Sequence, residues 1–175
     1  RKDRRNKIIV GSILLGIMLL STAGYAFFNN EGPNGGVEKV RYNGIDFYRQ
    51  GEYWQAQIQG YNLYFHYLPN ETRKVMLGKS IADYAGKIVY FEKMESAEQE
   101  IGINFNQMKI KWQLACLDEN CTENLPLKNC SSDLIITKYQ ENMSTIRTED
   151  NCIYIISNES VREADAFIYS LLKIQ

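Results

Sequence analysis

A long uncharged segment near the N-terminus constrains this chain more than any other feature. Residues 8–28 read IIVGSILLGIMLLSTAGYAFF and contain no acidic or basic side chain. A helix of this length measures about 31 Å, which matches the roughly 30 Å hydrocarbon core of a bilayer. Residues 1–7 carry five basic side chains and one acid. Because basic flanks remain cytoplasmic, the pattern predicts a transmembrane anchor with a cytoplasmic N-terminal tail and the rest of the chain outside.

A cleavable signal peptide is the alternative interpretation of this segment. Residues 1–7 would form its basic region and residues 8–20 its apolar core, with Gly24 and Ala26 as the small residues of a cleavage site. The apolar run continues through Phe28, which is longer than a signal peptide needs, so the anchor is favoured. Both interpretations place the remaining chain outside the cytoplasm, either at the cell membrane or secreted.

The rest of the chain is long enough for one domain. About 147 residues follow the segment, enough for one domain with its own hydrophobic core but not comfortably for two. Residues 29–36, NNEGPNGG, read as a flexible linker, so we expect an extracytoplasmic domain over residues 37–175. The whole chain has a formal net charge of −1 and the first seven residues contribute about +4, so this domain is acidic. An acidic domain without a basic cluster argues against nucleic-acid binding.

Four cysteines lie in the C-terminal part of the chain, an even number that predicts two disulfides in an oxidising compartment: Cys116, Cys121, Cys130 and Cys152. Three pairings are possible. Cys116–Cys121 with Cys130–Cys152 is preferred, because the first closes a local turn and the second ties a loop to the start of a strand. A zinc site of four thiolates is the alternative, although the paired C-x2-C spacing of zinc ribbons is missing.

Five Asn-x-Ser/Thr sequons support an extracytoplasmic location, since this motif is the acceptor for N-glycosylation. Two of them, at Asn120 and Asn129, have a cysteine at the middle position, where a disulfide could hinder modification. The candidate glycosylation sites are therefore Asn70, Asn142 and Asn158.

Residues 37–68 carry the clearest β pattern. The pairs Asn43-Gly44, Gln50-Gly51 and Gln59-Gly60 recur at regular intervals and are typical of hairpin turns. They separate four predicted strands of an antiparallel meander, over residues 38–42, 45–49, 52–58 and 62–68. Alternation sends one set of side chains inward: Ile45, Phe47, Trp54, Ala56, Ile58, Leu63, Phe65 and Tyr67.

Residues 80–175 change periodicity repeatedly, as an α/β unit does. Ser80–Asp83 resembles a capping box that opens a short helix. A strand over residues 87–93, a helix that begins near Ser96 and a strand over residues 109–116 form a βαβ unit, which implies a parallel strand pair. A polar loop follows over residues 117–132.

The C-terminal part of this unit reads strand, strand, helix. Strands are predicted over residues 134–139 and 151–157, and Ser160–Glu163 resembles a capping box for a closing helix with one apolar stripe. The fold class is therefore mixed, α+β or α/β. A transmembrane helix precedes an antiparallel meander and a βαβ-ββα unit, which we expect to form one compact ectodomain.

Several motifs together resemble a family of known sequences: YNGIDF at residues 42–47, YW at 53–54, FHYLPNE at 65–71, an AC…C…LPLKNCS stretch, NCIYI at 151–155 and ADAFIYSLLKI at 164–174. In these motifs the chain is similar to uncharacterised short, single-anchor membrane proteins of small-genome archaea. The resemblance covers most of the ectodomain and fits a cell-surface location. It implies no particular chemistry.

Catalytic signatures are scarce in this sequence. Its one histidine, His66, lies mid-strand and is interpreted as a satisfied or solvent-facing residue rather than a catalytic base. No phosphate-binding, zinc-protease or nucleophile-elbow motif occurs, so no catalytic residue, metal or cofactor is predicted. Asp165 flanks the apolar stripe of the last helix and is interpreted as a boundary residue, paired with Arg162 or solvated.

The outer face of the meander is the candidate binding surface. It gathers aromatic rings and amides that suit the recognition of proteins or sugars: Tyr48, Tyr53, Gln55, Gln57, Tyr64 and His66. The alternative is that a second layer of the same domain covers these residues.

A membrane-anchored binding or scaffold domain that contacts another cell-envelope protein or a glycan is therefore the leading functional hypothesis. Two alternatives remain. One is an accessory subunit of a membrane complex, with Gly11, Gly16 and Gly24 allowing close helix packing. The other is an extracytoplasmic hydrolase that uses carboxylates.

Overall fold

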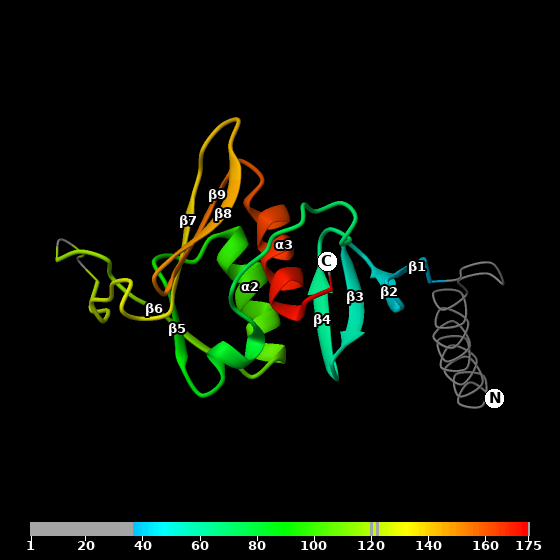
Figure 1. Ribbon diagram of the computed structural model, residues 1–175, viewed down its shortest axis with the longest axis horizontal. Coiled ribbons are helices and arrows are strands. Elements are labelled where there is room, and N and C mark those ends of the chain that lie inside the picture. The colour runs from blue at the N-terminus through cyan, green and yellow to red at the C-terminus, as the bar shows by residue number, and fades with distance from the viewer. Residues whose placement is uncertain (1–36, 120, 122, 175) are drawn as a thin grey trace, which may run out of the picture. The chain divides into compact units, whose positions relative to one another are not determined.

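The computed structural model describes residues 37–119, 121 and 123–174 (Figure 1). The predicted anchor, the linker and Asn120 lie outside the described residues. Within them, no helix is both long enough and apolar enough to cross a bilayer. Residues 38–174 belong to one compact unit, which is mixed α+β. Element labels follow Figure 1.

The first sheet is the predicted antiparallel meander. Its strands are paired in the order of the chain: β1 (Lys39–Tyr42), β2 (Ile45–Gln50), β3 (Tyr53–Ile58) and β4 (Tyr61–Phe65). In the first turn, Asn43 and Gly44 have φ values of 46° and 82°, the pair of positive angles that a type I′ hairpin requires. The turn residues therefore set the register of the meander, as the sequence indicates.

The last strand of the meander is shorter than predicted. It was expected to reach Leu68 but ends at Phe65. The backbone N–H groups of the next two residues, His66 and Tyr67, donate to the side chain of Asp165 instead of to a strand. A distant carboxyl group therefore ends the strand.

The second sheet has five strands in the order β6-β5-β7-β9-β8. After a short 3-10 helix, η1 (Ile81–Tyr84), the chain forms these elements: β5 (Ile88–Phe91), α2 (Ser96–Gln107), β6 (Lys111–Leu114), β7 (Leu134–Lys138), β8 (Ser144–Glu149), β9 (Cys152–Ser157) and α3 (Ser160–Leu172). β5 is parallel to β6 and β7, and β7 is parallel to β9. The parallel β5-α2-β6 unit is confirmed.

One strand and two helix caps differ from the sequence-based expectation. β8, with the sequence STIRTE, was missed because its residues are mostly polar and exposed, and it pairs antiparallel with β9 at the sheet edge. The helices α2 and α3 begin after Glu95 and Glu159, one residue earlier than each predicted cap. The capping box Ser80–Asp83 is present, with the Ser80 N–H donating to the Asp83 carboxylate over 2.7 Å.

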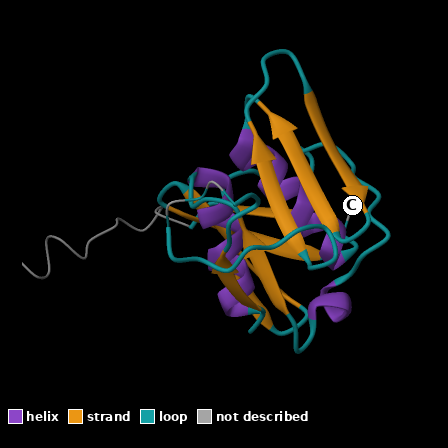
Figure 2. Ribbon diagram, turned by 90° about the vertical axis from the view of Figure 1, so that its left-hand side faces the viewer, coloured by secondary structure: helices purple, strands orange, loops and turns teal. Residues whose placement is uncertain are grey.

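The two helices lie between the two sheets (Figure 1). Figure 2, turned by 90°, shows helices behind the strands that face the viewer. Ten consecutive residues of α3, residues 163–172, are buried. The single apolar stripe predicted for this helix is therefore an incomplete description, because α3 is covered on more than one side and contributes the centre of the protein.

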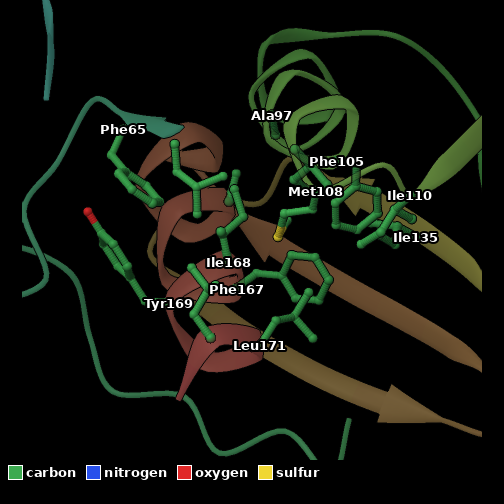
Figure 3. Close-up of a cluster of buried hydrophobic side chains, with 14 of the residues drawn as sticks. Phe65, Ala97, Phe105, Met108, Ile110, Ile135, Phe167, Ile168, Tyr169 and Leu171 are labelled. Atoms are coloured by element: carbon green, nitrogen blue, oxygen red, sulfur yellow. The ribbon is translucent and has the colours of Figure 1, made fainter. Parts of the chain in front are cut away.

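Aromatic side chains join the layers (Figure 3). Phe65 of β4 stacks on Tyr169 of α3 with ring centroids 4.4 Å apart, and Phe47 of β2 meets the edge of the same tyrosine at 6.3 Å. Phe167, on the same helix, lies 6.4 Å from Phe105 of α2. Six of the eight residues predicted to point inward are buried: Phe47, Trp54, Ala56, Ile58, Leu63 and Phe65. Ile45 is half-buried, and Tyr67 is half-buried and lies beyond the end of β4. Helix α3 is the surface on which this face packs.

Two disulfides, Cys116–Cys121 and Cys130–Cys152, match the preferred pairing. The zinc alternative is wrong in this structure, because both pairs are oxidised and leave no thiolates. Cys130–Cys152 fastens the long loop to the first residue of β9, and Cys116–Cys121 closes a turn just after β6.

Removing the Phe65 ring tests the role of the meander-to-helix contact. Phe65→Ala leaves a cavity against Tyr169 and is expected to lower the free energy of unfolding by about 3–5 kcal/mol. Tyr139→Ala is the control, because Tyr139 is 72% exposed and its loss should cost less than about 0.5 kcal/mol. Chemical denaturation of the full chain in detergent measures both, and equal effects would contradict this packing.

The two disulfides should contribute unequally to stability. They span 22 and 5 residues, which corresponds to loop-closure contributions of about 3 and 2 kcal/mol. Replacing Cys130 and Cys152 by alanine should therefore destabilise the protein more than replacing Cys116 and Cys121. Mass spectrometry provides the check on oxidation: reduction should add about 4 Da, and no change in mass would exclude the disulfides.

Candidate functional site

The six predicted binding residues lie on or beside one face of the meander. Tyr48, Gln55 and Tyr64 are paired across β2, β3 and β4, so they form a row. Their sequence neighbours on these strands, such as Phe47, are buried on the opposite face. We name the set Tyr48, Tyr53, Gln55, Gln57, Tyr64 and His66 the tyrosine face.

The tyrosine face is open at one end and partly shielded elsewhere. Tyr48 is 40% exposed and Gln57 is exposed, whereas Tyr53, Gln55, Tyr64 and His66 are half-buried. Lys39 lies over the Tyr48 ring at 5.3 Å and forms an ion pair with Asp46 at 2.9 Å. A hydrogen bond from Lys39 lowers the pKa of this half-buried carboxyl group. The alternative that a second layer covers this face as ordinary core is therefore wrong for its exposed end.

His66 connects the tyrosine face to the interior. Its ring packs against the Tyr53 ring, with centroids 4.4 Å apart. Its Nδ1 lies 3.0 Å from Oε2 of Glu100, a residue of α2 that is 3% exposed. The imidazole keeps 31% of its own surface exposed. One side chain therefore contacts both the surface and a buried carboxyl group.

Asp165 lies behind His66 and is completely buried. Its Oδ2 accepts hydrogen bonds from the backbone N–H groups of His66 and Tyr67, at 3.0 and 2.9 Å. Burial raises the pKa of Asp165 well above its usual value, and the charge of Glu100 and a hydrogen bond with that side chain raise it further. The expected pairing of Asp165 with Arg162 is wrong, because Arg162 pairs with Glu159 at 2.6 Å.

Asn104 of α2 completes the closure of the β4 edge. Its side chain accepts from the Tyr64 N–H at 2.9 Å and donates to the Tyr64 carbonyl at 2.7 Å. These are the two bonds that a further strand would make. Asn104 and Asp165, one from each helix, therefore bind backbone groups of Tyr64, His66 and Tyr67 at the β4 edge of the meander.

Two other acids are buried, but each has partners of its own. Glu98 accepts a hydrogen bond from the Thr137 hydroxyl, and Glu163 accepts from Ser144 and from Arg73, the latter at 2.6 Å. The Glu100–Asp165 pair differs because its two buried carboxyl groups are neighbours of each other.

Sequence reasoning missed Glu100, Asn104 and the burial of Asp165. Glu100 and Asn104 are four residues apart, and each immediately precedes a buried apolar residue of α2, Ile101 or Phe105, so this spacing was an available signal. Nothing in the sequence indicates that Asp165, 65 positions further on, is their neighbour.

The structure also places the other predicted residues. Asn70, Asn142 and Asn158 are exposed, as accessible sequons must be, whereas the Asn129 side chain accepts hydrogen bonds from Ser131. In the part of the chain that the structure describes, no group of three or more His, Cys, Asp or Glu residues is arranged to hold a metal ion. A surface depression of about 530 Å³ lies beside Trp112, with no residue of the tyrosine face in its lining.

Comparisons with protein-family models, curated proteins and solved structures found no match to this chain.

The pH dependence of stability tests the state of Asp165. Because its pKa is raised in the folded protein, the folded state binds more protons than the unfolded chain above pH 3.8 or so. The resulting stabilisation is complete below that pH and is lost as pH rises through the raised pKa. Relative to Asp165→Asn, the wild type should lose up to about 1 kcal/mol per pH unit in this range.

Chemical denaturation of the full chain at a series of pH values measures this difference. Asp150→Asn serves as the matched control, since it removes one exposed carboxyl group by the same substitution. Parallel stability profiles for the wild type and Asp165→Asn would contradict the raised pKa.

Proposed function

We propose that this protein is a membrane-anchored, extracytoplasmic binding or scaffold domain whose tyrosine face contacts another cell-envelope protein or a glycan. Residues 8–28 would serve as the transmembrane helix and residues 1–7 as its cytoplasmic tail. The two disulfides support an oxidising location. The resemblance to single-anchor archaeal proteins is compatible with such a location.

The row Tyr48–Gln55–Tyr64 is the observation on which the proposal depends. Aromatic rings provide rigid contact area at low entropic cost, and amides add directional hydrogen bonds. The row lies on a sheet whose other face is occupied by core residues such as Phe47 and Phe65. A ligand can therefore bind the tyrosine face without any rearrangement of the fold.

The carboxylate hydrolase is less well supported. Glu100 and Asp165 are the two acids that the structure brings together, but they are only 3% and 0% exposed. A catalytic carboxyl group must reach the substrate directly or through one water. Buried as they are, these acids act on the surface only through His66.

Cross-linking in native membranes tests the proposed function. The full chain is expected to form a discrete cross-linked species with an envelope protein or glycan. Tyr48→Ala combined with Tyr64→Ala should reduce that species at least tenfold, since central aromatic residues dominate binding energy.

Tyr139→Ala is the matched control, because it removes an exposed tyrosine that lies outside the tyrosine face. Full cross-linking by the double variant would exclude this face as the contact surface. Failure of a membrane-impermeant lysine reagent to label residues 37–175 in intact cells would exclude the extracytoplasmic location.

A further inference from the structure

Glu100 and Asp165 are two buried carboxyl groups that are both hydrogen-bonded to His66. In each carboxyl group one oxygen is already bonded: Asp165 Oδ2 to the backbone of His66 and Tyr67, and Glu100 Oε2 to the His66 ring. The other two oxygens, Asp165 Oδ1 and Glu100 Oε1, are buried and have no hydrogen-bond partner. One proton shared between the two carboxyl groups would satisfy both oxygens, and burial together with the neighbouring Glu100 raises the pKa of Asp165.

We propose that this shared proton regulates ligand binding by the tyrosine face. While the proton is held, Glu100 accepts the His66 Nδ1–H and fixes the imidazole against Tyr53. When the proton is lost at higher pH, two adjacent carboxylates repel each other, Glu100 withdraws from His66, and the binding surface loses its ordered edge. This regulation rests on the proposed binding function.

His66 is the residue that transmits the change. Its backbone N–H is bound to Asp165, its ring Nδ1 to Glu100, and its ring face to Tyr53. A change in the charge of the buried pair therefore acts on two different groups of a residue whose side chain is 31% exposed. No movement of the helices is needed for the signal to reach the surface.

The surroundings make the second negative charge costly. Burial disfavours a charged carboxyl group, and a second carboxylate nearby disfavours it further. Two nearby arginines have other acidic partners: Arg162 pairs with Glu159, and Arg73 with Glu163, each at 2.6 Å. The charged and titratable groups beside the pair, or in contact with its neighbours His66, Tyr67 and Tyr169, come from β3, the residues that follow β4, and α3: Tyr53, His66, Tyr67, Glu71, Arg162 and Tyr169.

Asparagine at position 165 would provide the hydrogen bonds without the titration. Its carbonyl oxygen can accept from the His66 and Tyr67 N–H groups, and its NH2 group can donate to Glu100. The variant Asp165→Asn should therefore keep the edge of the face in its ordered state at every pH. This makes it the matched control for the proposal.

Nuclear magnetic resonance of the His66 ring provides the first test. The chain contains a single histidine, so its imidazole signals need no assignment. In the full chain in detergent, the wild-type ring signals should show an inflection over the pH range in which the buried pair loses its proton. Asp165→Asn and Glu100→Gln should lack this inflection. Absence of the inflection in the wild type would overturn the proposal whether or not a ligand is known.

Binding provides the second test, with the envelope component captured by cross-linking as the probe. Wild-type affinity should fall at least tenfold across the pH range of the inflection that the two variants lack, whereas the affinity of Asp165→Asn should stay constant over the same range. That inflection without any change in affinity would overturn the regulation and leave the proposed function standing. Absence of binding by the tyrosine face at every pH would exclude both the regulation and the proposed function.

Discussion

The free edge of strand β4 is buried against the two helices, and much of the central architecture follows from that constraint. A strand edge presents unpaired N–H and C=O groups, and each one left buried without a partner costs about 1–3 kcal/mol. Here the edge meets two helices rather than another strand. Asn104 of α2 and Asp165 of α3 supply the missing hydrogen bonds. The helices must therefore be polar at defined positions although they lie in the core.

Asp165 satisfies the N–H groups of His66 and Tyr67 with a carboxyl group, and this choice of side chain has an electrostatic consequence. An amide would satisfy the same backbone N–H groups without the possibility of a charge. Asp165 instead lies beside Glu100, and burial together with that second acid raises its pKa. The core thus contains a proton whose binding depends on pH, and His66 connects it to the surface.

The tyrosine face follows from the packing of the opposite face. Successive side chains of a strand point to opposite sides, so the burial of Phe47, Ala56 and Leu63 sends their neighbours outward. The register then aligns Tyr48, Gln55 and Tyr64 in one row. The proposed binding surface and the hydrophobic core are therefore two aspects of one alternating pattern.

The sequence by itself determined the features that depend on neighbouring residues. Asn43-Gly44 and the later glycine turns, together with period-two alternation, specify the meander, and strand–helix–strand spacing specifies the parallel β5-α2-β6 unit. Tertiary structure alone decided the rest. The polar strand β8 forms because β9 lies beside it, β4 stops early because Asp165 takes its N–H groups, and Glu100 meets Asp165 across 65 positions of chain. Local conformational preferences are encoded in a few adjacent residues, whereas the meeting of distant polar groups is fixed only when the layers pack.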